Sequence, residues 1–185
     1  IFAIGPDKEI FDEIGIGIIW TLFLLSSNLS IRKFYNDDFN DGTLVLFLIS
    51  RISLEFIVIL KMIVSWLFFQ IPFLFIIPIA CLMLNINMDK TLLLLSTFAI
   101  GAPILITLSS ISSSMNLLND KNFTIGSVIV MLFSIPIIIF SVNIVESEVD
   151  YIWPQLNILL GILMFFLAIT PWISAWCIRT ALRNN

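Results

Sequence analysis

The stretch Thr91–Asn119, TLLLLSTFAIGAPILITLSSISSSMNLLN, contains no Asp, Glu, Lys or Arg in 29 residues. A helix of about 20 apolar residues crosses the hydrocarbon core of a bilayer, so this stretch predicts a membrane span. Four other stretches share this character: Ile14–Ile31, Met62–Met88, Asn122–Val145 and Tyr151–Ile178. We therefore predict an all-α, polytopic transmembrane helix bundle, with five spans in a single domain over residues 1–185.

The composition excludes several classes of protein. Hydrophobic residues make up 59% of the 185 residues and charged residues only 12%, whereas a soluble domain carries about 25% charged residues. A net charge of −4, with nine Lys and Arg in total, argues against a nucleic-acid partner. The sequence has no histidine, which excludes catalytic His triads, His-based zinc sites and axial His ligation of haem within these residues.

Little in the chain suggests chemistry of its own. Cys81 and Cys177 both lie in apolar stretches and are predicted to be small buried hydrophobic side chains. The phosphate-binding pattern G-x-x-x-x-G-K-[ST] does not occur, so any ATP hydrolysis must come from another chain. No predicted span has an ionisable residue near its centre, which disfavours a proton- or ion-coupled carrier acting alone. We predict a non-catalytic subunit that binds no cofactor or metal.

Polar side chains within or beside the spans favour helix packing. Gln70, Asn143 and Asn157 are suited to interhelical hydrogen bonds. A serine-rich run, Ser109, Ser110, Ser112, Ser113 and Ser114, favours close helix contact over nucleophilic catalysis, because no base stands beside it. Such a bundle is typical of the passive membrane part of a machine that another chain powers.

The distribution of Lys and Arg predicts the topology, because these residues stay on the cytoplasmic side near span ends. One orientation places seven bases inside: Arg32, Lys33, Arg51, Lys61, Lys121, Arg179 and Arg183. Only Lys8 and Lys90 then lie outside. We therefore expect Ile1 outside and Asn185 inside. Because the sequence starts outside and lacks Met at position 1, we expect an N-terminal truncation and six spans in the full-length protein.

Five prolines fall inside the predicted spans: Pro72, Pro78, Pro103, Pro136 and Pro171. Each removes a backbone donor and is expected to kink its helix, and the freed carbonyl then needs another partner. Thr107, Ser109 and Ser134 are candidate donors. Two interpretations stay open: ordinary kinks in a bundle, or broken helices that let the bundle rock between states.

The connection of residues 32–54, the longest between spans, is predicted to be cytoplasmic. Aromatic residues (Phe34, Tyr35, Phe39) and aspartates (Asp37, Asp38, Asp41) alternate there, which predicts a short amphipathic helix ending at Gly42. One interpretation is an interfacial helix with its aromatics among the headgroups. The three aspartates favour a protein partner instead, because anionic lipid would repel them. Residues Thr43–Leu60 are expected to lie along the interface before the next span.

An ordered series of motifs resembles the haem exporter protein B family. It begins with Ile4-Gly-Pro-Asp7, Gly17-Ile-Ile-Trp20, Leu24-Leu-Ser-Ser27 and Asp37-Asp38-x-x-Asp41-Gly42-x-Leu44. It continues with Lys61, Trp66, Pro72, Gly101-Ala-Pro103, Pro136-Ile-Ile-Ile-Phe140, Thr170-Pro171 and Arg179. No single motif is specific, but the series covers nearly the whole chain.

The resemblance implies the permease subunit of an ABC-type transporter for cytochrome c maturation, multi-pass in the bacterial inner membrane or alternatively the mitochondrial inner membrane. The implied partners are a separate ATP-binding cassette subunit, a haem-handling membrane subunit, a small single-span subunit and a second permease copy. ATP, bound by the partner, would drive export of haem or release of a haem-loaded periplasmic chaperone. Haem is then a cargo of the complex. Two alternatives remain: a permease of a lipid or polysaccharide ABC exporter, and a non-transporting structural membrane subunit.

The same resemblance implies an ATPase-coupling segment within residues 32–54. Its candidate residues are Phe34, Tyr35, Asp37, Asp38, Asp41, Gly42 and Leu44.

Overall fold

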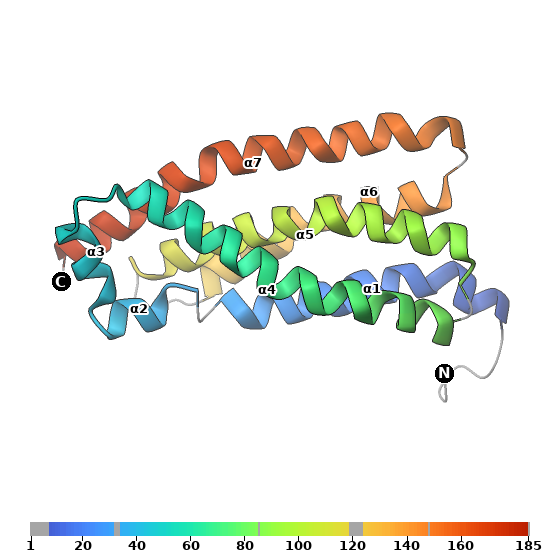
Figure 1. Ribbon diagram of the computed structural model, residues 1–185, viewed down its shortest axis with the longest axis horizontal. Coiled ribbons are helices and arrows are strands. Elements are labelled where there is room, and N and C mark those ends of the chain that lie inside the picture. The colour runs from blue at the N-terminus through green and yellow to red at the C-terminus, as the bar shows by residue number, and fades with distance from the viewer. Residues whose placement is uncertain (1–7, 32–33, 85, 119–123, 148, 185) are drawn as a thin grey trace.

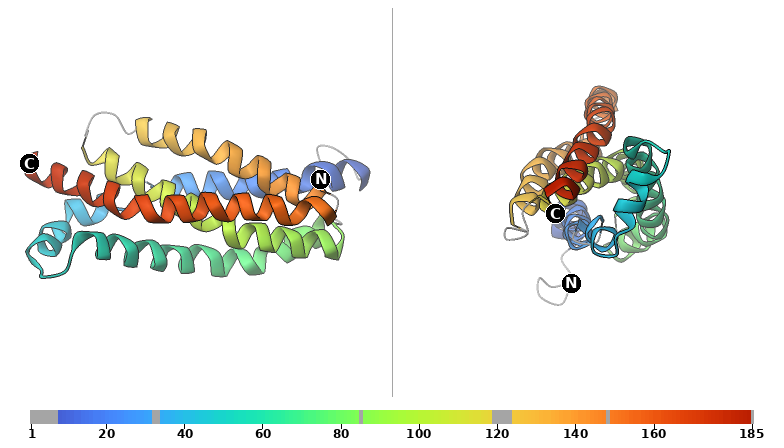
Figure 2. Two further views of the ribbon diagram at one scale, coloured as in Figure 1. Left: turned by 90° about the horizontal axis from the view of Figure 1, so that it is seen from above. Right: turned by 90° about the vertical axis from the view of Figure 1, so that its left-hand side faces the viewer.

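A computed structural model describes residues 8–31, 34–84, 86–118, 124–147 and 149–184, and every regular element in these ranges is a helix. Five long helices run side by side along one axis (Figures 1 and 2). They are α1 (Lys8–Ile31), α4 (Leu54–Met83), α5 (Met88–Asn116), α6 (Thr124–Glu146) and α7 (Val149–Asn184). Two short helices, α2 (Asn36–Asn40) and α3 (Thr43–Ile49), lie at the end of the bundle that also holds the C-terminus (Figure 1). The predicted all-α bundle is confirmed.

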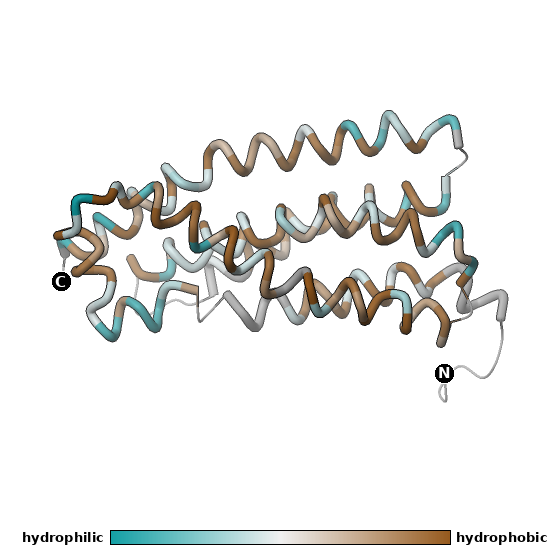
Figure 3. The backbone as a smooth tube through the Cα atoms, viewed as in Figure 1, coloured by the Kyte–Doolittle hydropathy of each residue, from teal (hydrophilic) through white to brown (hydrophobic). Residues whose placement is uncertain are grey.

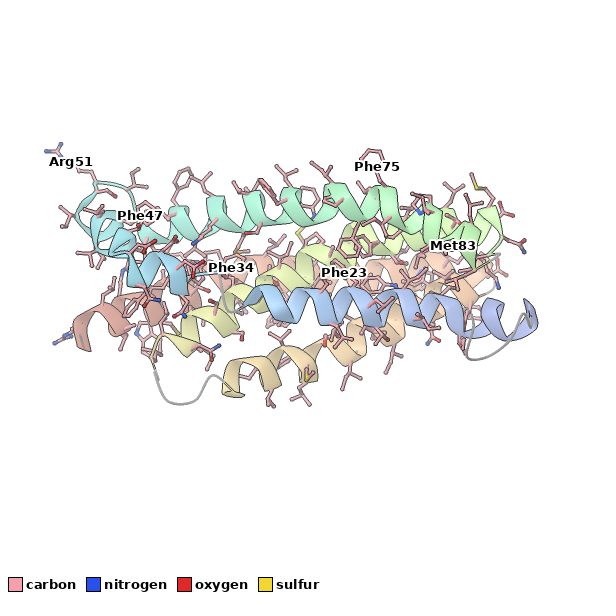
Figure 4. The ribbon with its side chains drawn as sticks, turned by 90° about the horizontal axis from the view of Figure 1, so that it is seen from below. Phe23, Phe34, Phe47, Arg51, Phe75 and Met83 are labelled. Carbon is pink, nitrogen blue, oxygen red and sulfur yellow. The ribbon has the colours of Figure 1, made fainter. Side chains whose placement is uncertain are left out.

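Within the residues that the structure describes, four helices, α4 to α7, are long and apolar enough to cross a membrane. The predicted span Ile14–Ile31 lies within α1, where Ile14–Ser26 is an apolar helix among the residues that the structure describes. Along α4, large apolar side chains such as Phe68, Phe75 and Leu82 are exposed, and brown, hydrophobic colour runs along most of the helix (Figure 3). Phe75 points away from the bundle in Figure 4. This outer surface is suited to lipid and not to water.

Helix α5 is the buried centre of the bundle and contacts α1, α4, α6 and α7. Small residues let its neighbours approach closely. A β-carbon at Gly101 would overlap the ring of Trp20 on α1, so only glycine fits at that crossing. Beside it, Phe23 of α1 meets Phe98 of α5 and Phe73 of α4 edge to face, with ring centroids 4.3 and 4.6 Å apart. This aromatic cluster joins three helices.

The expectation that Thr43–Leu60 lies along the interface is wrong for its second half, because α4 already begins at Leu54. Leu54, Val58 and Met62 form an i, i+4, i+8 stripe that is buried against the other helices. Burial of this stripe stabilises the extra turns as part of the long helix. Only α3 remains as a separate short helix before it, after which Ser50 and Ser53 adopt extended backbone angles.

The five predicted kink prolines all lie inside helices: Pro72 and Pro78 in α4, Pro103 in α5, Pro136 in α6 and Pro171 in α7. The expected donors to their freed carbonyls are wrong. The hydroxyls of Thr107, Ser109 and Ser134 donate to the carbonyls of Ile104, Leu105 and Met131. These acceptors lie three or four residues back on the same helix, which is the local geometry that Ser and Thr reach most easily.

Candidate functional site

The candidate site is the α2–α3 segment (residues 34–49), which joins α1 to α4 across one end of the bundle (Figure 1). Phe34, Tyr35 and Leu44 are buried, with exposed fractions of 7, 1 and 2%. They pack in one cluster with residues of α4, α5 and α7: Leu54, Val58, Met62, Ile106, Leu117, Ala175, Ile178 and Ala181. The hypothesis that the aromatics lie among lipid headgroups is therefore wrong for Phe34 and Tyr35, which anchor the segment to the bundle.

Tyr35 is also held by hydrogen bonds to the serine run of α5. Its hydroxyl lies 2.8 Å from Ser110 Oγ, which in turn lies 3.2 Å from Ser174 Oγ on α7. Its backbone N–H donates to Ser113 Oγ at 3.2 Å. Burial raises the pKa of the Tyr35 phenol, and the nearby negative charge of Asp38 raises it further. The phenol therefore stays protonated at neutral pH, and one residue ties the segment to two helices.

Lys61 of α4 ties the same segment to a third helix. Its ammonium forms an ion pair with Asp38, and each of these side chains is 27% exposed. The ammonium also lies 5.0 Å from the ring centroid of Tyr35 and 5.9 Å from that of Phe34, within range of a cation–π interaction. Asp38, predicted among the partner-facing acids, is thus neutralised within the chain.

The turn from α2 to α3 depends on Gly42. Its φ of 74° lies in the left-handed region, and its N–H donates to the carbonyl of Phe39. The prediction that a helix ends at Gly42 is confirmed. Asp37 in α2 and Asp41 just before Gly42 are exposed. Within the described part of the chain their carboxylates form no ion pair, and they make a small negative surface facing away from the bundle.

A second ion pair lies at the same end of the molecule. Arg179 Nη2 of α7 is 2.8 Å from Glu55 Oε1 of α4. Arg51, between α3 and α4, is exposed and points outward (Figure 4). Two ion pairs, Lys61–Asp38 and Arg179–Glu55, therefore lie at this end of the bundle.

Sequence reasoning missed Lys61, Ser110, Ser113 and Ser174 as parts of this site. One signal was present. Ile106, Ser110, Ser113 and Leu117 recur at i, i+4, i+7 and i+11, which places them on one face of α5. That face is the one that the cluster around Phe34 and Tyr35 covers.

The remaining candidates for ligand binding are sparse. Cys81 and Cys177 are buried free thiols, and the described residues bring no three His, Cys, Asp or Glu together. A cavity of about 490 Å³ lies between α4, α5 and α7. Its lining is apolar apart from Trp66 and Thr107, and it includes Pro103. This lining contains no charged side chain that would hold a polar ligand.

Comparisons with known proteins show the family. A family model described as CcmB protein matches residues 1–181. The chain belongs to the CcmB protein family. Heme exporter protein B of Haemophilus influenzae is 29% identical over 185 residues, covering 98% of this chain and 83% of its own length. The protein of the same name from Bradyrhizobium diazoefficiens is 29% identical over 186 residues, with the same coverage. That of Escherichia coli K12 is 33% identical over 72 residues, which are 39% of this chain. The resemblance drawn from the sequence is confirmed, and this CcmB family member is a multi-pass membrane protein.

Proposed function

We propose that this chain is the permease subunit of a complex for cytochrome c maturation, in which a separate ATPase subunit acts on the bundle through the α2–α3 segment. The observation that carries the proposal is the division of this segment into two parts. Phe34, Tyr35 and Leu44 are buried in the bundle, whereas Asp37 and Asp41 face outward. A segment that is anchored on one side and charged on the other is suited to pass a partner's movement inward.

The distribution of bases supports a cytoplasmic location for this end. Arg51, Lys61, Arg179 and Arg183 lie at or near it, whereas Lys90 lies at the start of α5, at the opposite end. Lys and Arg near span ends stay in the cytoplasm, where an ATPase subunit would meet the segment. Asp37 and Asp41 would then face basic residues of that subunit, because complementary charge guides and orients association.

The relatives' name, Heme exporter protein B, suggests what the movement serves. We propose that the bundle, driven by ATP hydrolysis on the partner, assists transfer of haem to a periplasmic chaperone. It would do so either by exporting haem or by releasing the loaded chaperone. Within the described residues no cluster of metal-ligating side chains is present, so we assign haem to the complex as cargo. The other expected partners are a haem-handling membrane subunit, a small single-span subunit and a second permease copy.

Charge reversal on the exposed face tests the proposal. Asp37→Arg combined with Asp41→Arg should reduce co-purification of the ATPase subunit by about tenfold or more, because two attractive contacts become repulsive. The matched control is Asp89→Arg with Asp150→Arg. These two acids are also exposed, but they lie in the first turns of α5 and α7, at the other end of the bundle.

The control variant should retain the ATPase subunit and normal yields of holo-cytochrome c. If the variant at positions 37 and 41 also retains both, the segment does not couple to an ATPase, and a structural role for the chain is favoured instead.

A further inference from the structure

We infer that the Tyr35 hydroxyl and its partners Ser110 and Ser174 transmit movement of the α2–α3 segment to the C-terminal part of α7. Tyr35 is then a positioning residue of the coupling mechanism. This inference rests on the function proposed above and names the contacts through which that function would operate.

The hydrogen bonds of Tyr35 connect the α2–α3 segment first to α5 and then, through α5, to α7. Its hydroxyl reaches Ser110 of α5 at 2.8 Å, and Ser110 reaches Ser174 of α7 at 3.2 Å. Tyr35 is 1% exposed, and Ser110 and Ser174 are fully buried. Water therefore cannot replace these bonds without a change in packing. Apolar contacts between Phe34 or Leu44 and the bundle can slide, whereas hydrogen bonds have a fixed direction and hold a register.

The serines can exchange partners, and the tyrosine cannot. Ser109 and Ser114, in the same run of α5, donate to carbonyls of their own helix at Leu105 and Ile111. Ser110 and Ser174 can adopt that same local bond when Tyr35 withdraws. A phenol has no backbone carbonyl of its own helix within such reach, so a displaced Tyr35 must leave the buried site or lose its partner. We therefore expect the network to have a second arrangement, and the position of Tyr35 to select between the two.

The C-terminal part of α7 has features that allow it to move when Tyr35 moves. Pro171 lies three residues before Ser174 inside α7, and it removes the hydrogen bond that would stiffen the helix there. Beyond this point, Arg179 pairs with Glu55 of α4. Lys61, also of α4, holds the segment through Asp38. The part of α7 after Pro171 is thus connected to the segment by Ser174 and to α4 by Arg179, and it is the element that Tyr35 can move.

The experiment measures two movements separately in the assembled complex, by distances between pairs of spin labels with and without nucleotide. One pair, at Asn40 and Asp89, reports the segment relative to the far end of α5. The other pair, at Arg183 and Asp89, reports the end of α7. These three positions are exposed. In the native sequence we expect nucleotide to shift both distances.

Tyr35→Phe keeps the ring and removes the hydroxyl. We expect it to retain the ATPase subunit and the shift at Asn40, to lose the shift at Arg183, and to lower the yield of holo-cytochrome c by about fivefold or more. A size-matched pair at position 174 isolates the hydroxyl further. Ser174→Thr keeps it and should behave like the native sequence, whereas Ser174→Val should reproduce the loss, since both add the same bulk.

The inference is overturned if Tyr35→Phe keeps both shifts, if neither distance responds in the native sequence, or if the two variants at Ser174 behave alike. Should Tyr35→Phe fail to assemble, the pair at Ser174 decides. These results are distinct from failure of the proposed function, in which no ATPase subunit binds the native chain or reversal of Asp37 and Asp41 has no effect.

Discussion

Replacement of Lys61 by Met should loosen the α2–α3 segment while leaving the long helices in place. Met keeps most of the length and apolar character of the lysine stem, so the change removes mainly the charge. It leaves Asp38, whose side chain is only 27% exposed, without its ion-pair partner. It also removes the cation that lies 5.0 Å from the ring centroid of Tyr35.

The magnitude follows from these two interactions. A partly exposed ion pair is screened by solvent, and we assign it about 1 kcal/mol, at the upper end of surface pairs. The cation–π contact adds about 0.5–1 kcal/mol at this exposure. A sum of about 1.5–2 kcal/mol corresponds to a roughly 10- to 30-fold larger population of the detached segment.

Hydrogen–deuterium exchange in nanodiscs measures this population directly. The reporters are the amides of Phe39, Asp41 and Gly42, which donate to carbonyls within the segment. Their exchange should accelerate by about tenfold or more in Lys61→Met. Adding Asp38→Asn should recover part of the protection, because an amide does not need a charged partner.

Arg179→Met is the matched control, since it removes the other ion pair at this end, between α7 and α4. It should leave exchange in the segment nearly unchanged. Equal acceleration in both variants, or less than about twofold in Lys61→Met, would show that the segment is held by its apolar contacts alone, and the reasoning above would be refuted.

Three further predictions concern other features of the chain. Gly42→Val should destabilise the segment by about 1–2 kcal/mol, because φ at position 42 is 74° and a β-branched residue is strained there. Thermal melts of Gly42→Val and Gly42→Asn measure this loss, and equal melting temperatures would contradict the prediction. Burial raises the pKa of Tyr35, so the contribution of the neutral phenol to stability is complete below about pH 10 and is lost as the pH rises through the raised pKa. Tyr35→Phe should therefore reduce the fall in melting temperature at alkaline pH, and an unchanged fall would argue against it. In a background without the native cysteines, an impermeant maleimide applied to intact cells should label Asp150→Cys and spare Asn40→Cys, and the reverse pattern would overturn the proposed orientation.

The long helices could be predicted because each contains a stretch without charge. The start of α4 could not, since Glu55 and Lys61 stand before that stretch and suggest a polar connection. In the fold each charge is neutralised by a residue distant in the sequence, Arg179 for Glu55 and Asp38 for Lys61. Local composition does not show such long-range pairing, so the prediction from composition started the α4 span about two turns too late.

The same limit applies to the candidate site. The role of Gly42 at the end of α2 could be predicted from the sequence, because a glycine that follows a short helix commonly adopts the left-handed conformation that ends it. The partners of Tyr35 lie 75 and 78 positions away in the chain, and their contact depends on how α5 is rotated. Sequence pattern identified the acids, but only packing decides that Asp38 is paired while Asp37 and Asp41 face outward.

The close crossing of α1 and α5 has a consequence for how the protein is made. Helix α1 buries Trp20 and Phe23 completely in the finished bundle. Its large side chains Trp20 and Phe23 pack on Gly101 and Phe98, which the ribosome adds more than 70 residues later. During synthesis this face of α1 therefore lacks its packing partners on α5 until α5 enters the bilayer beside it. A nascent chain that stopped after α4 would lack the glycine and the phenylalanine of α5 on which these two side chains pack.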